Sequence, residues 1–191
     1  MSTGGAIIGV SDHNGWAVLV TIASDGTLLD RRRVELVDAD LPKMPHHHEA
    51  QALSPEQATD LVERVRASAD RHAKLVLDAA ARTVALPIRV VAIRKCPPLP
   101  PTIAERIRDY RAQNVADTVM YRNALAGAAE SRGWSVQWYD SKKVFDAARD
   151  ALQVDDLDAH FLQLRRAVGP PWNQDHKLAM AAAIVVARKG I

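Results

Sequence analysis

The stretch AIIGVSDHNGWAVLVTIASDGTLLDRRRVELV, residues 6–37, decides the fold. It contains three runs of β-forming residues, at 6–11, 16–23 and 27–37, which His13-Asn14-Gly15 and Ser24-Asp25-Gly26 separate. Asn-Gly and Asp-Gly are turn pairs of tight hairpins because their residues tolerate a positive φ. We therefore expect a three-stranded antiparallel meander at the start of the chain.

Helices and two further strands are predicted downstream of the meander. Ser54-Pro55-Glu56-Gln57 carries a helix N-cap, a proline at the first helical position and a capping-box glutamine. Apolar residues then recur with helical spacing for about 28 residues. Apolar runs at 88–93 and 135–139 are typical of strands, and helical patterns cover 103–132, 141–152, 155–167 and 175–189, with Asn114 as a candidate break in the first of these.

Right-handed crossovers would place the fourth and fifth strands parallel to the first strand. The expected fold class is therefore α/β, with a five-stranded mixed sheet that combines the antiparallel meander with two parallel strands and is flanked by helices. We expect residues 1–191 to form a single domain.

The composition excludes several classes of protein. Of the 191 residues, 48% are hydrophobic and 25% are charged, which excludes collagen-like and mostly disordered chains. The net charge of +2 neither requires nor excludes a nucleic-acid partner. Because there is one cysteine, Cys96, and no basic signal-peptide region, we expect a cytoplasmic protein without an internal disulfide. No apolar run approaches the ~20 residues of a membrane span, so insertion into a membrane is not expected.

Two stretches of the second half resemble a known family. In RNALAGAAESRGWSVQWYDSKKVFDAA (122–148) and DHKLAMAAAIVVA (175–187), the features follow the same order as in that family. They are a helix with an Arg-Gly signature, a strand, a Val-Lys helix and a closing acidic, alanine-rich helix. With its strand order, the chain resembles the ribonuclease-H-like superfamily and its Holliday-junction-resolvase (RuvC-like) branch. The resemblance implies a ribonuclease-H-like fold, a divalent-metal-dependent phosphodiester hydrolase and structured nucleic acid as the substrate.

The catalytic pattern of that branch is only partly present. The branch carries a carboxylate two residues after the glycine of the first strand, whereas this chain has Ser11 there and Asp12 one residue later. A shift of one residue along a strand turns a side chain to the other face of the sheet. Arg94-Lys95-Cys96 stands where the branch has a glutamate, and Leu178 replaces a second aspartate on the last helix. Asp175 matches the first acidic position of that helix.

The topology brings polar residues that are distant in sequence to one edge of the sheet, outside the carboxyl ends of the parallel strands. The candidate cofactor is a divalent metal, Mg²⁺ or Mn²⁺, with Zn²⁺ as a further option because imidazole groups accompany the carboxylates. The candidate catalytic residues are Asp12, Glu49, Asp140 and Asp175. The candidate metal ligands are Asp12, Asp175, His46, His48 and His176. The candidate substrate-binding cations are Arg94, Lys95 and Lys177.

Each candidate also has a purely structural explanation. Asp12 belongs to a segment that reads as a tight turn, His46 and His48 to a polar loop, and Asp175 can serve as a helix cap. Two hypotheses of function follow. The first is a metal-dependent nuclease acting on structured nucleic acid, and the second is a catalytically inactive ribonuclease-H-like binding or assembly module. An actin-like ATPase shares the meander but needs two such domains. The partners considered are nucleic acid and a second copy of the chain in a homodimer.

Overall fold

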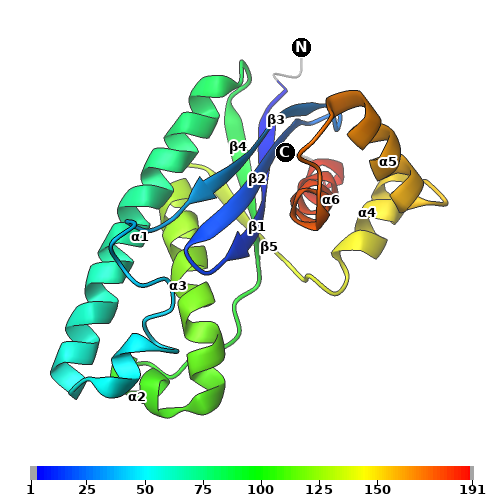
Figure 1. Cartoon of the computed structure of the whole chain (residues 1–191). Coiled ribbons are helices and arrows are strands. Elements are labelled where there is room, and N and C mark those ends of the chain that lie inside the picture. The colour runs from blue at the N-terminus through cyan, green and yellow to red at the C-terminus, as the bar shows by residue number, and fades with distance from the viewer. Residues whose placement is uncertain (1–3, 190–191) are drawn as a thin grey trace.

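The computed structural model describes residues 4–189 and contains a five-stranded sheet in the order β3-β2-β1-β4-β5 (Figure 1). β1 (Ala6–His13), β2 (Trp16–Ala23) and β3 (Leu28–Glu35) form the antiparallel meander. β4 (Ile88–Arg94) pairs in parallel with β1, and β5 (Ser135–Tyr139) pairs in parallel with β4. The predicted five-stranded mixed sheet is confirmed.

The first strand is longer than the sequence pattern indicated. It continues through Asp12 and His13, which pair with Ala17 and Trp16 of β2. The turn is therefore tight, and Gly15 adopts a φ of 79°, in the left-handed region that favours glycine. As a consequence, Ser11 and Asp12 lie in regular strand and project to opposite faces of the sheet.

The helices follow the predicted order, with one break in a different place. The predicted segment 103–132 is divided at Asp109, whose Oδ1 accepts hydrogen bonds from the backbone N–H groups of Arg111 and Ala112 at 2.8 and 3.2 Å. Asn114, the expected break, lies inside a continuous helix. The helices are η1 (Glu49–Ala52), α1 (Pro55–Thr83), α2 (Ile103–Arg108), α3 (Tyr110–Glu130), α4 (Val144–Leu152), α5 (Leu157–Val168) and α6 (Gln174–Arg188).

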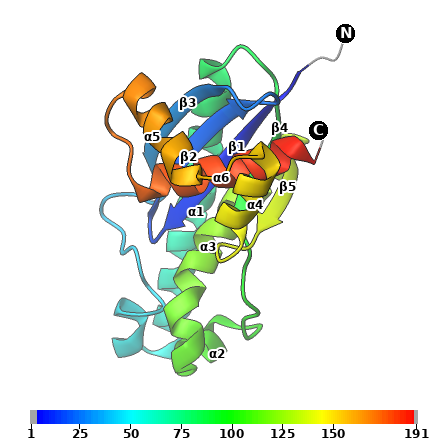
Figure 2. The ribbon, with the colours of Figure 1, turned by 90° about the vertical axis from the view of Figure 1, so that its right-hand side faces the viewer.

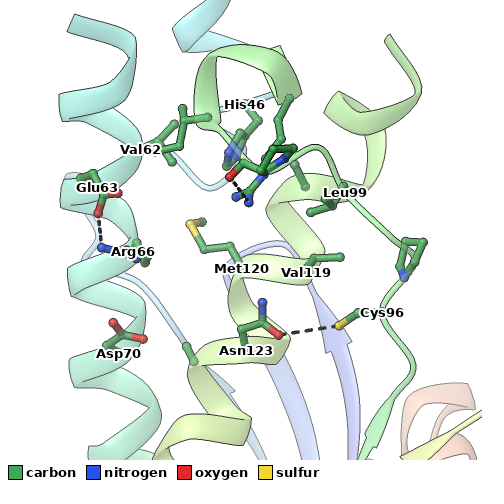
Figure 3. Close-up of a pocket in the computed structure, with 16 residues that line it drawn as sticks. His46, Val62, Glu63, Arg66, Asp70, Cys96, Leu99, Val119, Met120 and Asn123 are labelled. Atoms are coloured by element: carbon green, nitrogen blue, oxygen red, sulfur yellow. Dashed lines mark hydrogen bonds and ion pairs between the residues drawn. The ribbon is translucent and has the colours of Figure 1, made fainter. Parts of the chain in front are cut away.

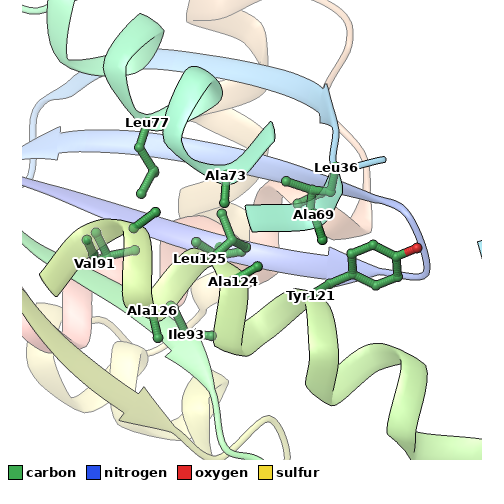
Figure 4. Packing of buried hydrophobic residues seen from close by; sticks show 14 of the residues in the cluster. Leu36, Ala69, Ala73, Leu77, Val91, Ile93, Tyr121, Ala124, Leu125 and Ala126 are labelled. Carbon is green, nitrogen blue, oxygen red and sulfur yellow. The ribbon is translucent and has the colours of Figure 1, made fainter. Parts of the chain in front are cut away.

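The capping box predicted at the start of α1 is present. The Ser54 side chain accepts from the backbone N–H of Gln57, and the Gln57 side chain accepts from the backbone N–H of Ser54. α1 and α3 cover one face of the sheet, and α4, α5 and α6 lie on the other (Figures 1 and 2). Between α1, α3 and the sheet, side chains such as Leu77, Val91 and Leu125 form a buried apolar layer (Figure 4).

A close contact positions α6 against β1. A Cβ atom on Gly9 would lie 1.9 Å from the carbonyl oxygen of Ala179, so only glycine permits this approach of the helix. The N-terminal halves of α1 and α3, with η1 and α2, extend beyond the sheet edge at which β1 and β4 end (Figures 1 and 2). Among the described residues, no helix has the length and apolar character needed to cross a membrane.

Candidate functional site

The end of β1 presents two polar side chains to opposite faces of the sheet. On the α6 face, the Ser11 hydroxyl donates a hydrogen bond to Asp175 Oδ1 at 2.9 Å. On the α3 face, Asp12 Oδ2 accepts from Arg122 Nε at 2.7 Å. Asp12 comes one residue later than the carboxylate of the resolvase branch, so its side chain faces α3, as expected. The position that faces α6 is occupied by Ser11. Asp12 and Asp175 do not point into a shared volume.

Asp12 is held in a basic environment. Its side chain is fully buried, and Arg94 Nε lies 3.7 Å from Asp12 Oδ1, in addition to the contact with Arg122. Arg122 Nη1 also donates to the backbone carbonyl of Lys95 at 2.9 Å, which fixes the guanidinium between α3 and the end of β4. Two guanidinium groups therefore accompany one carboxylate, and the cluster carries a net positive charge.

Asp175 belongs to a second, separate cluster at the start of α6. Its Oδ1 accepts from Ser11 and lies 2.7 Å from His13 Nε2, and the His13 ring stacks on Trp16 with ring centroids 4.0 Å apart. Asn173, not Asp175, caps the helix by accepting from the backbone N–H groups of Asp175 and His176. The Asp175 carboxylate thus links α6 to the β1–β2 hairpin.

The histidine triplet lies on the opposite side of the sheet from Asp175. His46 Nδ1 donates to Asp117 Oδ1 at 2.7 Å, and the backbone N–H groups of His46 and His47 donate to the same carboxylate. His48 is exposed, as is Glu49 at the start of η1. These residues belong to the extension formed with α1 and α3, so they do not join the carboxylates of the sheet edge.

The remaining candidates are dispersed as well. Asp140 Oδ1 accepts from the backbone N–H of Lys142 and shapes the turn before α4, and Lys177 pairs with Asp158 at 2.8 Å. His176 is buried near Asn173, and burial together with the nearby Arg31 guanidinium lowers the pKa of its imidazole. Lys95 is exposed at the end of β4.

The donor set at the sheet edge does not fit the divalent metal that the resemblance implies. Hard cations require carboxylate oxygens that converge and are free to coordinate. Asp12 is engaged with arginines, and Asp175 lies on the other face and contacts Ser11 and His13. In residues 4–189, no group of three or more His, Cys, Asp or Glu side chains has the arrangement of a metal site. The five predicted ligands Asp12, Asp175, His46, His48 and His176 are therefore not brought together.

The edge is instead rich in cations. Exposed Lys95 follows β4, and exposed Lys142 and Lys143 follow β5, next to half-buried Arg94. The arginines of β3 are not part of this surface. Arg31 donates to the backbone carbonyls of Val168, Gly169 and Pro171, and the Arg33 guanidinium lies 4.4 Å from the centre of the Trp16 ring.

The sequence did not identify Asp117, and it indicated Arg122 only as one of several arginines of a candidate nucleic-acid surface, not as the buried partner of Asp12. Arg122 lies in α3 among alanines and Leu125, and Asp117 lies one helical turn before the buried Tyr121. Both are charged residues on an otherwise apolar helix face. Since a charge at such a position requires a partner, their spacing is the signal that could have revealed the buried contacts of Arg122 with Asp12 and of Asp117 with His46.

Comparisons with known proteins find similarity in structure, whereas comparisons of sequence find no match. No family model and no curated protein sequence matches the chain. Among solved structures, Thermus thermophilus RuvC in complex with a Holliday junction substrate is similar with a TM-score of 0.54 and 17% identity, over 97% of this chain and 96% of that chain. Another structure of T. thermophilus RuvC gives a TM-score of 0.51 and 17% identity, over 96% of this chain and 93% of that one. The chain therefore has a ribonuclease-H-like fold.

Proposed function

We propose that this protein binds structured nucleic acid at the carboxyl edge of its sheet without cleaving it, as a non-catalytic relative of the Holliday-junction-resolvase branch. The observation that carries the proposal is the ion pair between Asp12 and Arg122, with Arg94 beside it. It engages the Asp12 carboxylate with arginines, whereas metal-dependent phosphodiester hydrolysis needs free carboxylates.

The charge of the edge supports an anionic partner. Lys95, Lys142 and Lys143 are exposed, and none of them forms an ion pair within residues 4–189, so their ammonium groups are available to phosphates. Arg122 neutralises the buried Asp12, so that carboxylate adds little repulsion.

The likeness to RuvC supports structured nucleic acid as the class of partner. It extends over nearly the whole of both chains, and one of the two structures holds a Holliday junction. At 17% identity the likeness supports the fold alone. The choice of nucleic acid as the partner therefore also rests on the positive charge of the edge.

Binding and cleavage are tested together. Fluorescence anisotropy with labelled four-way junctions, duplex DNA, single-stranded DNA and double-stranded RNA should show saturable binding, tighter for the branched or duplex forms. The same substrates, incubated with the protein in Mg²⁺ or Mn²⁺, should remain intact on denaturing gels. Absence of binding to every substrate at low salt would refute the proposal.

A metal-dependent nuclease is the second candidate, favoured by the contact of 2.9 Å between the β1 residue Ser11 and Asp175 of α6. This contact brings together two segments that carry acidic residues in the resolvase branch. Of the four predicted catalytic carboxylates, Asp12, Glu49, Asp140 and Asp175, only Asp175 lies at this contact. Metal-dependent cleavage that disappears in Asp175→Ala and persists in Asp158→Ala, an exposed aspartate of α5, would favour this candidate over binding alone.

A further inference from the structure

Two features of the described structure are not explained by the proposed binding of nucleic acid. One is a cavity of about 580 Å³ between α1, α3 and the segment that follows β4, where Arg66 pairs with Glu63 and the Cys96 thiol lies 3.9 Å from Asn123 Oδ1 (Figure 3). Charged residues of both signs line this cavity, so it does not select one kind of ligand. The other feature is the outer edge of β5, whose chemistry is more definite.

β5 forms the margin of the sheet opposite β3, and within residues 4–189 it pairs with β4 alone (Figure 2). The carbonyl of Tyr139 accepts from the backbone N–H of Lys95 at 2.9 Å, so Tyr139 directs its backbone groups to β4. Alternate residues of a strand direct these groups to opposite sides. The N–H and C=O groups of Val136 and Trp138 therefore point away from β4, to a side on which the described chain places no further strand.

The sequence of β5 lacks the features that protect the edges of sheets. Edge strands commonly carry charged residues, proline or a bulge, which hinder pairing with another chain. None of the five residues of β5 is charged or a proline, and its pairing with β4 has no bulge. β3, at the other margin, carries charged residues along its length, namely Asp30, Arg31, Arg32, Arg33 and Glu35. β5 is thus the margin that is open to a further strand.

The side chains of β5 add an apolar surface on one face of the sheet. Val136 packs against the core beneath α1 and α3, and Trp138, two residues later, lies on the same face. Trp138 is nevertheless 41% exposed. Tryptophan is enriched at interfaces because its large ring gains much from burial. An exposed indole next to unpaired backbone groups therefore indicates a surface that a partner covers.

The pattern of β5 is complementary to itself. When two copies of the strand run antiparallel about a two-fold axis at Gln137, Val136 of each copy lies opposite Trp138 of the other, and the strands overlap over their whole length. Both residues direct N–H and C=O groups outward, so each such pair exchanges two hydrogen bonds. Each pair also places an indole beside a β-branched side chain, which is a favourable cross-strand contact.

The charges that flank β5 also favour this arrangement. Exposed Glu130 precedes the strand and exposed Lys142 follows it, and Arg132 is engaged with Asp78. Antiparallel pairing places the end of one strand beside the start of the other. It therefore brings unlike charges closer together than like charges at both ends of the paired strands.

We infer that the partner of this edge is a second copy of the chain, and that two β5 strands join their five-stranded sheets into one continuous sheet. The interface is small for a permanent dimer, so association is reversible and depends on protein concentration. The two carboxyl edges then point in opposite directions. The inference does not rest on nucleic-acid binding, although a dimer of a protein that binds nucleic acid would carry two such edges.

The association is measured on the wild-type protein without nucleic acid. In sedimentation equilibrium, we expect the mean mass to rise with concentration from that of one chain towards that of two. Hydrogen exchange, followed by NMR, should show the amide protons of Val136 and Trp138 exchanging more slowly at high concentration, because they donate hydrogen bonds only in the dimer. The amide of Gln137, which is directed to β4, should change much less.

A charge swap at the two-fold axis tests the register. Gln137 faces the same residue of the other copy, and its side chain is exposed. Gln137→Lys or Gln137→Glu alone should weaken the dimer about three- to tenfold, since like charges then lie opposite each other. An equal mixture of the two variants should restore association, because unlike charges meet. Gln163→Lys, at an exposed position of α5, should leave the dissociation constant unchanged.

Three results would overturn the inference. They are the mass of one chain up to the highest soluble concentration, a dimer whose dissociation constant is the same in the wild type and in both Gln137 variants, and equal exchange of the Val136 and Trp138 amides at low and high concentration. The mass of one chain would leave the edge to an extended segment of another protein. Because every measurement is made without nucleic acid, failure here leaves the proposed nucleic-acid binding standing.

Discussion

Asp12 shows how one residue position changes the chemistry of a strand end. Because it lies on the α3 face, it meets Arg122 in a buried ion pair of 2.7 Å. Removal of one partner from such a pair leaves the other charge uncompensated. We therefore predict that Arg122→Met lowers the free energy of unfolding by about 3–5 kcal/mol, measured by urea denaturation.

The double variant Asp12→Leu/Arg122→Met shows how much of this loss in unfolding free energy comes from the unpaired Asp12 carboxylate and how much comes from lost packing. It should be more stable than Arg122→Met alone, since apolar replacements remove both charges. Arg149→Met is the matched control, because Arg149 pairs with Asp146 on the surface and should change stability by less than about 1 kcal/mol. If Arg122→Met were as mild as this control, Asp12 would not depend on Arg122.

His176 predicts a pH dependence of stability. Burial, with the Arg31 guanidinium nearby, lowers the pKa of this imidazole from its ordinary value of 6.5, so the folded protein binds the proton less readily than the unfolded chain. Its contribution to stability is therefore complete above pH 6.5 and is lost as the pH falls below that value. In His176→Gln, the fall in unfolding free energy between pH 7 and pH 5 should be shallower than in the wild type. Parallel curves for the two proteins would contradict this assignment.

At the scale of elements, the approach of α6 to β1 depends on Gly9. A methyl group there would meet the Ala179 carbonyl at 1.9 Å, and the backbone of α6 would have to move. Gly9→Ala should lower the free energy of unfolding, measured by urea denaturation, by about 1–3 kcal/mol. The matched change Gly127→Ala, in α3 with no neighbour within 4 Å, should instead raise stability by about 0.5–1 kcal/mol. Equal effects at both positions would mean that α6 does not pack as described.

Local chemistry accounts for the elements that were predicted from the sequence. The Ser54 capping box and the Asn14-Gly15 turn satisfy backbone groups within a few residues, so their patterns are visible in sequence. The break before α3 was misplaced because Asp109 caps a new helix within one residue of the previous one, and no glycine or proline marks it.

The partners at the candidate site were much harder to predict. Arg122 is separated from Asp12 by 110 positions, and Ser11 from Asp175 by 164. The convergence of β1 with α6 follows from the topology, and the alternation of side chains along a strand indicates which face Asp12 occupies. The identity of its partner depends on the rotation of α3 about its axis, which hydrophobic periodicity defines poorly in an alanine-rich helix.

At the scale of the whole molecule, a net charge of +2 conceals an uneven distribution. The arginines of β3 contact backbone carbonyls and neighbouring side chains, whereas Lys95, Lys142 and Lys143 project from the carboxyl edge. The proposed binding of nucleic acid therefore depends on a small part of the surface, which the total charge does not reveal.

Because the exposed lysines lie at the carboxyl edge of the sheet, the salt dependence of binding tests whether this edge contacts nucleic acid. If the three lysines contact phosphates of a duplex or junction, each contact contributes about −0.9 to the slope of log K against log salt concentration. The variant Lys95→Ala/Lys142→Ala/Lys143→Ala should then have a slope shallower by about 2–3 than the wild type, with weaker binding at every salt concentration. Lys74→Ala, at an exposed position in the C-terminal half of α1, should change the slope by less than about 0.5. If the triple variant kept the wild-type slope, the phosphates would contact another surface, and the arginine pair at Asp12 would have only a structural role.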